Sequence, residues 1–230
     1  MTPHTVHTQS PWDVIRGWKQ PPAAGEPGRQ ILVRNAEGHA IGALTPVTGR
    51  EAEDTAVCAA LTRWRRMFRQ YFLTQFEPTA ERTRDWLLNV VLPDDSRLLF
   101  LIRDENHNPV GNFGICGIGP GVGELDNLIR GQKGGDAKLV YYSELALLDW
   151  MYRELQTERV CLHVFSSNAK TLLLHTSVGF EQTQRQPLAR ITDGAETRYV
   201  PWGAAGEPAG FDLVRMELGR DAFRSLYPWI

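Results

Sequence analysis

Short apolar runs separated by turn residues predict a sheet at the core of the chain. Residues 30–35 and 40–46 are two such runs, joined through the turn pair Glu37-Gly38. Two denser runs, 97–104 and 110–118, flank the sequence ENHNP and predict a hairpin. Further strands are predicted at 123–129, at 159–166, from Phe180 onward and at 211–218.

Apolar residues three and four positions apart predict helices between these strands. The first helix is expected over 50–72, and the second follows Thr79, which suits an N-cap. A longer helix is expected at about 137–155, and a short one closes at Gly179. The spaced apolar residues are Leu61, Trp64, Phe68 and Phe72 in the first helix and Tyr141, Leu145, Leu148, Tyr152 and Leu155 in the third.

Two segments lack such periodicity. Residues 1–28 are rich in proline, glycine and threonine, so we expect a weakly structured N-terminal arm ahead of a single domain at 29–230. The segment 193–210 is long for a connection in a compact domain, and it is interpreted as a lid or an oligomer contact.

Composition excludes several functional classes. The net charge of -2 and the pI near 6.3 provide no overall basic field, which argues against nucleic-acid binding. Three widely spaced cysteines provide neither a disulfide framework nor a metal pattern, so a reducing compartment, the cytoplasm, is expected and no metal. No window approaches the ~18 apolar residues that a membrane span needs.

The sequence RGQKGGDAK at 130–138 stands between a predicted strand and the long helix. A glycine loop before a helix leaves backbone N–H groups unpaired, and the helix dipole favours negative charge there, so this is anion-binding geometry. The P-loop pattern is absent from this stretch, and the other glycine cluster, GPGVG at 119–123, does not fit the dinucleotide fingerprint. A different phosphate-bearing cofactor is therefore favoured.

Two motifs in a defined order point to a family. Gln132-Lys133-Gly134-Gly135-Asp136-Ala137 fits the pattern [QR]-x-x-G-x-[GA], and Asn168 precedes a short apolar helix that ends in Gly179-Phe180. Strand, glycine loop, helix, strand and short helix follow one another around these motifs. In this the chain resembles the GNAT superfamily of acyl-CoA-dependent N-acyltransferases over roughly 30–182, with the cofactor core at about 96–182.

The resemblance implies an α/β (α+β) fold with a mixed, mostly antiparallel central sheet, flanking helices and splayed central strands. It implies acetyl-CoA (coenzyme A) as cofactor, its pyrophosphate on the glycine loop and its pantetheine arm between the splayed strands. The carboxylate of Asp136 is unfavourable next to a pyrophosphate. If Asp136 caps the helix, its side chain points away from the phosphates. The implied cofactor residues are Leu128, Ile129, Arg130, Gln132, Lys133, Gly134, Gly135, Asp136, Ala137, Lys138, Asn168 and Lys170.

Acyl transfer to an amine needs a base and a proton donor for the leaving thiolate. Glu124 and Asp126 are two apart on one strand and face the same way, so either is a candidate base. His175 occupies the position where the family usually has a tyrosine, and an imidazolium can protonate a thiolate. The alternative for His175 is a buried structural histidine, and His163 is less favoured as a catalytic residue.

The resemblance places the first helix and its exit at the acceptor pocket. Arginines and aromatic residues in this region would suit an anionic or sugar-nucleotide acceptor, and a solvated basic face over an aromatic core stripe is the alternative. The candidate acceptor contacts are Arg66, Arg69, Gln75 and Phe76.

Three classes of function stay open at this stage. The first is an N-acetyltransferase for a small amine such as an amino sugar, amino acid or biosynthetic intermediate. The second is a protein or peptide N-acetyltransferase, which needs an open groove, and the third is a non-catalytic acyl-CoA-binding module, consistent with the missing tyrosine. A homodimer is left open.

Overall fold

The computed structural model describes residues 9–23, 25–203 and 206–230, and its strands in this part of the chain form one sheet in the order β1-β2-β4-β5-β6-β7-β10-β8-β9-β3. Within these residues β6 and β7 are the parallel pair and the other neighbours are antiparallel. The mixed, mostly antiparallel sheet is therefore confirmed. The strands are β1 Ile31–Arg34, β2 Ala40–Pro46, β3 Thr74–Gln75, β4 Leu98–Asp104, β5 Pro109–Gly119, β6 Val122–Arg130, β7 Arg159–Phe165, β8 Glu181–Asp193, β9 Glu196–Pro201 and β10 Glu207–Gly219.

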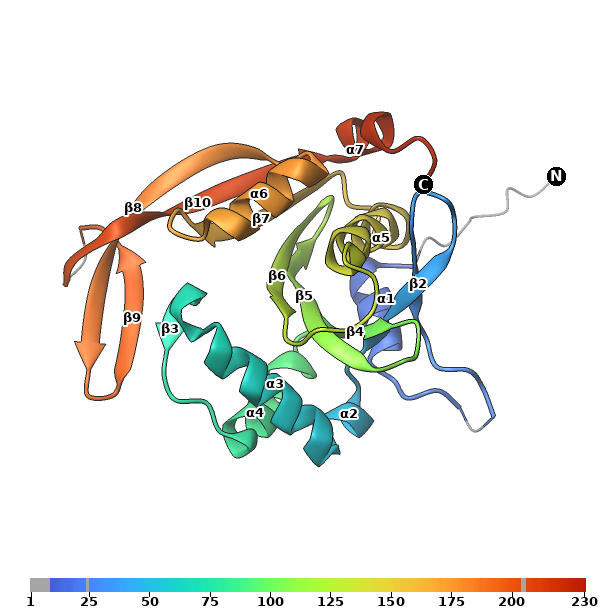
Figure 1. Cartoon of the computed structure of the whole chain (residues 1–230), viewed down its shortest axis with the longest axis horizontal. Helices are drawn as coiled ribbons and strands as arrows, with labels where there is room; N and C mark the ends of the chain where they lie inside the picture. Colours follow the sequence, from blue (N-terminus) through green and yellow to red (C-terminus); the bar gives the residue numbers. More distant parts are fainter. Residues whose placement is uncertain (1–8, 24, 204–205) are drawn as a thin grey trace.

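Helices cover both faces of this sheet (Figure 1). The helices α2, α3 and α4 pack on one face, and α1, α5, α6 and α7 contribute to the core on the other. They are α1 Pro11–Trp18, α2 Gly49–Glu53, α3 Thr55–Met67, α4 Ala80–Trp86, α5 Leu139–Glu154, α6 Ala169–Val178 and α7 Arg220–Leu226, with a 3₁₀ turn at Arg69–Tyr71 and a π turn at Leu87–Val91.

Strand β4 shows why its sequence is an unbroken apolar run. Side chains alternate across a strand, so Leu98, Phe100 and Ile102 enter the core under α5, whereas Leu99 and Leu101 enter the core under α3. All five are at most 2% exposed. A strand buried on both faces has no polar positions to alternate with.

The helix predicted over 50–72 is divided, which corrects the sequence interpretation. Asp54 ends α2 with extended backbone and caps α3, because its carboxylate accepts hydrogen bonds from the N–H groups of Ala56 and Val57. An aspartate at this position stabilises a new helix start more than continuation of the old one. The apolar spacing from Leu61 to Phe68 is otherwise as predicted.

The N-terminal segment is not weakly structured over residues 11–18, where the expectation was wrong. Helix α1 begins after Ser10, whose hydroxyl accepts the N–H of Asp13, and Ile15 is fully buried. Trp18 packs edge-on against Trp150 of α5, with ring centroids 4.8 Å apart. The proline-rich composition concealed a short amphipathic helix that contributes to the main core. Residues 1–8 of the expected arm lie outside the described residues.

Lys19 follows this helix and is buried beneath it. Its Nζ donates to the carbonyl oxygens of Val91 at 2.9 Å, Leu92 at 3.1 Å and Asp94 at 2.5 Å, so it caps the end of the π turn after α4. Burial lowers the pKa of Lys19 to about 8, against the partly opposing charges of Asp95 and Asp94. The N-terminal segment is thus fastened to the helices on the far side of the sheet.

The segment 193–210 is largely strand in its described residues, whereas the sequence shows no periodicity there. Gly194 occupies the turn of a β8–β9 hairpin with φ 56°, and β9 then pairs with β3, so that Thr74 lies opposite Arg198. Residues 204–205 lie outside the described residues. The hairpin extends from the end of the sheet back to the exit of α3 (Figure 1).

Candidate active site

The central strands separate after a short parallel stretch. Residues Val122–Leu125 of β6 pair with Arg159–Leu162 of β7, and beyond Leu125 the two strands diverge although both continue. The splay expected from the resemblance is therefore present. Backbone groups of β6 beyond this point have no neighbouring β7 strand to pair with, which creates a place where an extended ligand can add as a strand does.

A bulge in β6 marks the splay. On β5, Asn112 and Gly114 lie opposite Ile129 and Asp126, so β6 carries one extra residue there. Asn127 occupies the left-handed region at φ 51°, and its carbonyl oxygen accepts the buried side-chain amide of Asn112 at 2.5 Å. Bulges redirect side chains and bend strands, and here the bend leads β6 away from β7.

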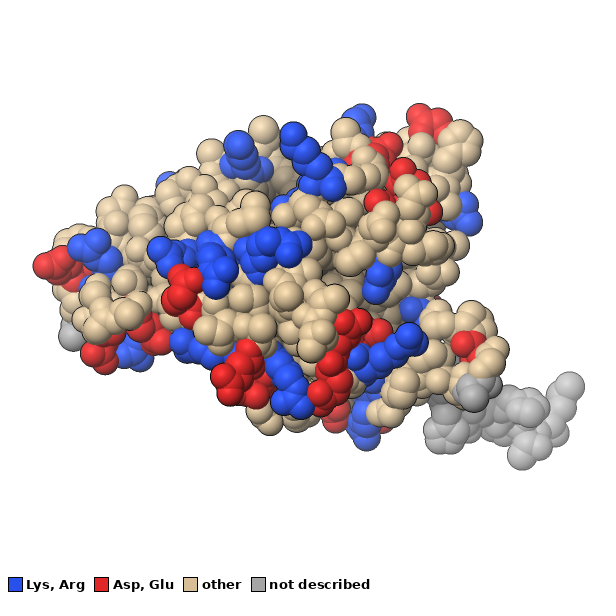
Figure 2. Space-filling model, turned by 60° about the horizontal axis from the view of Figure 1, so that its bottom comes forward, with Lys and Arg blue, Asp and Glu red and all other residues tan. Residues whose placement is uncertain are grey.

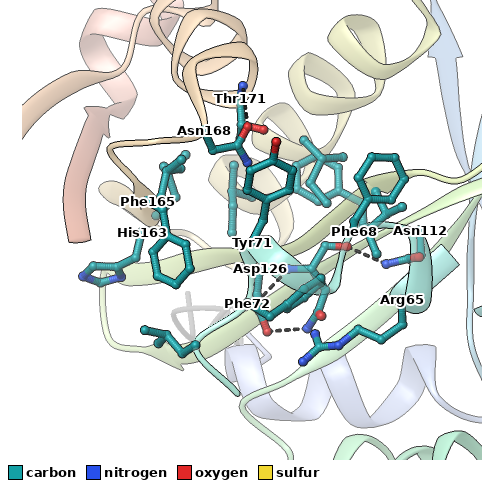
Figure 3. Close-up of a pocket in the computed structure, with 18 of the residues that line it drawn as sticks. Arg65, Phe68, Tyr71, Phe72, Asn112, Asp126, His163, Phe165, Asn168 and Thr171 are labelled. Carbon is teal, nitrogen blue, oxygen red and sulfur yellow. Dashed lines mark hydrogen bonds between the residues drawn. The ribbon is translucent and has the colours of Figure 1, made fainter. Parts of the chain in front are cut away.

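A cavity of about 970 Å³ occupies the opening between the two strands. Its walls come from the α3 exit, the splayed ends of β6 and β7, and the start of α6 (Figure 3). Tyr71 points from the α3 side toward Asn168 at the start of α6. Of the residues expected at the site, Phe76, Glu124, Asp126, Leu128, Ile129, Arg130, Asn168, Lys170 and His175 line this cavity.

Glu124 and Asp126 both face the cavity, but their partners differ. The Oε1 atom of Glu124 lies 2.8 Å from Nδ1 of His163, and both side chains are 32% exposed. Asp126 forms an ion pair with Arg97, with 2.9 Å between Oδ2 and Nη1, and accepts two hydrogen bonds from Asn127. Arg97 neutralises the charge of Asp126. Glu124 is therefore the carboxylate that contacts a group able to accept a proton, the imidazole of His163.

Cys116 and Cys161 lie on either side of Glu124, on β5 and β7. Burial, followed by the nearby carboxylates, raises the pKa of the Cys116 thiol to about 12 and raises that of Cys161 as well. A thiol in this state has little nucleophilic thiolate at neutral pH. The described residues contain no cluster of three or more metal-ligating side chains.

The arginines expected to contact the acceptor are not in the cavity. Arg66 and Arg69 both pair with Glu77 on the outer surface, at 2.5 Å and 2.9 Å. Gln75 also lies outside the cavity lining, and its amide donates to the carbonyl oxygens of Gln70 and Phe72.

Arg65 is the arginine of α3 that lines the cavity, and the sequence reasoning missed it. Its guanidinium carbon lies 3.2 Å from the centre of the Phe72 ring, and Nη2 donates to the Thr74 carbonyl. Burial lowers the pKa of Arg65 to about 10, opposed by Asp126. Leu61, Arg65 and Phe68 are spaced so that they lie on one face of the helix. This spacing is the sequence signal that could have identified Arg65. Arg66 is one residue, about 100° of helix, away from that face.

The glycine loop lies beyond the cavity lining, apart from Arg130. The guanidinium of Arg130 donates to the carbonyl oxygens of Gly134 at 2.8 Å and Ala137 at 3.3 Å, so Arg130 shapes the loop. Six expected cofactor residues are therefore placed outside the cavity lining together with Lys138: Gln132, Lys133, Gly134, Gly135, Asp136 and Ala137.

Local geometry explains two residues of this loop. Asp136 accepts the N–H of Lys138 at 2.6 Å, so it caps the approach to α5. Gly135 has φ 64°, and a Cβ there would lie 2.8 Å from Cβ of Asp104. Glycine is required at this position by both the left-handed backbone and the close approach.

His175 is buried on α6, 4% exposed, with its Nδ1 atom 2.6 Å from Oε1 of Glu144 on α5. Glu144 itself is fully buried. His175 also lines the cavity, so its ring stands between that carboxylate and the open space. The sequence analysis did not single out Glu144, because it lies among apolar residues of a buried helix.

The surface carries no extended field of one sign on the face turned forward in Figure 2, where acidic and basic side chains are interspersed. Ion pairs such as Arg84 with Glu53 account for part of this mixture. Within the described residues, no helix combines the length and apolar character that crossing a membrane requires.

Solved structures with a similar architecture include a spermidine N-acetyltransferase and two GNAT proteins. A spermidine N-acetyltransferase from Vibrio cholerae, in complex with CoA and spermine, has a TM-score of 0.58 at 17% identity and covers 78% of this chain and 96% of its own. FdhC, a nucleotide-linked sugar GNAT, has a TM-score of 0.58 at 13% identity, covering 82% and 92%. A probable GNAT-family acetyltransferase from Chromobacterium violaceum has a TM-score of 0.60 at 16% identity, covering 89% and 96%.

No protein-family model and no curated protein sequence matches this chain. The similarity is therefore carried by the three-dimensional structure, at identities of 13% to 17%. It agrees with the splay between β6 and β7 and the glycine loop before α5, which the sequence resemblance implied. The resemblance that the sequence motifs indicated is confirmed in its architecture: this chain has the fold of the GNAT N-acetyltransferases.

Proposed function

We propose that this protein is an N-acetyltransferase that moves an acetyl group from acetyl-CoA to the amine of a small molecule. The observation that carries the proposal is the cavity at the splay of β6 and β7, with Glu124 on its wall. An acyl carrier, an amine and a base can meet there. The spermidine N-acetyltransferase of Vibrio cholerae, which shares the fold, was solved with CoA in place.

The residues present fit coenzyme A. Backbone groups at the splayed end of β6 suit the pantetheine arm, and Asn168 and Lys170 line the cavity nearby. The glycine loop before α5 and the positive end of that helix suit the pyrophosphate, with Lys133 and Lys138 as cations. When bound, acetyl-CoA would supply an acetyl group on a thiol leaving group, and an N–H near Leu128 would polarise its carbonyl.

Glu124 is proposed as the base for the incoming ammonium. Its contact with His163 provides a second group that can hold the proton, and both are open to the cavity. The proton could pass directly or through one water, since a carboxylate alone is a weak base for an amine. Asp126 is proposed to position the bulge, because Arg97 and Asn127 occupy its oxygens.

The acceptor is proposed to be a small amine that carries an anionic group. Arg65 and Arg82 stand over the rings of Phe72 and Phe76 on the cavity wall, so the wall is cationic and aromatic. A polyamine would need several free carboxylates, and Arg97 already neutralises Asp126. The contact between β3 and β9 limits the α3 side of the cavity, which favours a small acceptor over an extended peptide.

Two measurements test the proposal. Coenzyme A should raise the melting temperature by mass action, and thiol release from acetyl-CoA should accelerate with an anionic amine such as an amino acid or amino-sugar phosphate. A melting shift without thiol release across the amine panel would identify a non-catalytic acyl-CoA-binding module. A melting temperature unmoved at millimolar coenzyme A would reject the cofactor.

A cytoplasmic location and a homodimer complete the proposal. Cys58, Cys116 and Cys161 are all free thiols, which supports a reducing compartment. Sedimentation at micromolar concentration would establish whether two copies associate.

A further inference from the structure

Glu144 and His175 form a buried pair at the inner wall of the cavity. Glu144 projects from the middle of α5 and His175 from the last turn of α6, with 2.6 Å between Oε1 and Nδ1. The second carboxylate oxygen of Glu144 is buried and has no hydrogen-bond partner. His175 makes the contact that links this carboxylate to the cavity.

A purely structural connection between the two helices would not need a carboxylate. Burying a carboxylate with one unsatisfied oxygen is costly, and a neutral amide or an apolar pair would join α5 to α6 at lower cost. Tyr227 already fastens this region, since its hydroxyl donates to the carbonyl of Val178 and contacts the hydroxyl of Tyr141. The charge of Glu144 therefore points to its effect on the imidazole.

We infer that Glu144 is a positioning residue that holds His175 as an imidazolium, with the Nε2 proton available to the leaving thiolate. The inference rests on the proposed function and extends it. A carboxylate at Nδ1 keeps a proton on that nitrogen in both states of the ring, so the proton exchanged is the one on Nε2. The buried negative charge also stabilises the positive ring.

The proton balance closes without a further reactant. The acceptor ammonium first loses one proton to Glu124. Glu124 passes that proton to solvent. The amine nitrogen then forms a bond to the thioester carbon and loses a second proton to water, while the carbon–sulfur bond breaks with its electron pair on sulfur. His175 gives one proton to that sulfur and regains one from solvent, so the turnover yields amide, free thiol and one released proton.

Few other titratable groups of the described residues lie near the pair or across the cavity from it. They are Tyr141 on α5, Tyr227 in the C-terminal segment and Lys170 on α6. Asp126 and Arg130 on β6 line the same cavity. Burial raises the pKa of Tyr227 above that of an ordinary tyrosine, with Tyr141 adding to this. An alkaline change in rate that depends on both Glu144 and His175 is thereby attributed to the ring.

The first experiment compares pH–rate profiles of thiol release for the wild type and for Glu144→Gln, which keeps the shape of the side chain. The alkaline fall in kcat should move to lower pH in Glu144→Gln, because the ring loses its counter-charge. The maximal kcat should fall about 10-fold or more. Glu144→Asp, which retains the charge, should restore most of the wild-type profile.

A background control separates positioning from packing. In His175→Tyr the proton donor no longer depends on the carboxylate, so adding Glu144→Gln should change kcat less than about twofold. An equal loss on both backgrounds, with no movement of the profile, would assign Glu144 to structure and overturn the inference.

The second experiment needs no turnover. Imidazole NMR of the free protein, with His175 assigned by its absence in His175→Tyr, should show a proton on Nδ1 and a titration midpoint that falls in Glu144→Gln. An unmoved midpoint would overturn the inference. If the midpoint moves but no amine elicits thiol release, the proposed function fails. If thiol is released with an unmoved profile, only the role of Glu144 fails.

Discussion

His163 and Glu124 meet at 2.8 Å at the end of the short stretch over which β6 and β7 pair. The contact lies next to the last paired residues, Leu125 and Leu162, and on the cavity wall. A carboxylate and an imidazole in contact can share a proton and release it to solvent. This pair is accordingly where we expect the acceptor amine to lose its proton.

Glu124→Gln should lower kcat/KM by about 10²-fold near neutral pH, and rising pH should restore part of the rate by supplying neutral amine. Steady-state thiol release across pH measures this. Asp126→Asn is the matched control on the same face, and it should mainly lower thermal stability because Arg97 loses its partner. A larger kinetic loss in Asp126→Asn than in Glu124→Gln would reverse the assignment.

Arg65→Ala should raise the acceptor KM about 10-fold or more with little effect on coenzyme A affinity, since it removes a cation from the cavity wall. It should also cost about 1 kcal/mol of stability through the lost stacking on Phe72. Arg66→Ala is the control one position along the helix, and losing a surface ion pair should change stability by less than about 0.5 kcal/mol. Equal KM values for the two variants would contradict the placement of the acceptor.

Tyr199→Ala should loosen the wall that the β8–β9 hairpin forms. Tyr199 packs edge-on against Phe165, a cavity residue, at 5.4 Å between ring centroids, and its N–H donates to the Leu73 carbonyl. We expect a lower melting temperature and a several-fold higher acceptor KM, because β3 loses support. The exposed neighbour Arg198→Ala should leave both unchanged. An acceptor KM in Tyr199→Ala equal to that of the wild type would mean that the hairpin does not shape the acceptor site.

Lys19 should make stability depend on pH in the alkaline range. Its pKa is lowered from 10.5 to about 8 in the folded protein by burial, so between these values the unfolded chain binds more protons. The contribution of Lys19 to the unfolding free energy therefore rises as pH increases from about 8 to about 10.5. Chemical denaturation measures the unfolding free energies of the wild type and Lys19→Met. The value for the wild type minus that for Lys19→Met should increase with pH across this window.

Lys138→Met, which replaces an exposed lysine, serves as the reference for that experiment. Its stability difference from the wild type should stay constant with pH. If the difference for Lys19→Met is equally constant with pH, the pKa of Lys19 in the folded protein is that of an ordinary lysine, which would contradict this prediction.

Most of the elements could be predicted from the sequence because their signals are local. The two-sided burial of β4 appears as an unbroken apolar run, Thr79 caps α4 and Gly179 ends α6 with left-handed backbone. Each of these depends on residues a few positions apart. The order of the glycine loop and the Asn168 helix was equally visible, and it led to the correct fold.

The site was less accessible, because its geometry joins residues that are distant in the sequence. Arg65 was one helical step from the arginine chosen, and only packing against Phe72 shows which one faces inward. The pairing of β3 with β9 joins segments more than a hundred residues apart, so the exit of α3 could not be placed beforehand.

By itself the sequence determined the alternation of strands and helices, their caps and the family resemblance, since hydrophobic periodicity and turn chemistry act within a few residues. Only the tertiary structure decided which polar side chains contact one another. Glu124 meets His163 and Glu144 meets His175 across 39 and 31 residues, respectively. Such contacts arise from the splay of two strands and the packing of two helices, and no local pattern encodes the distance between their side chains.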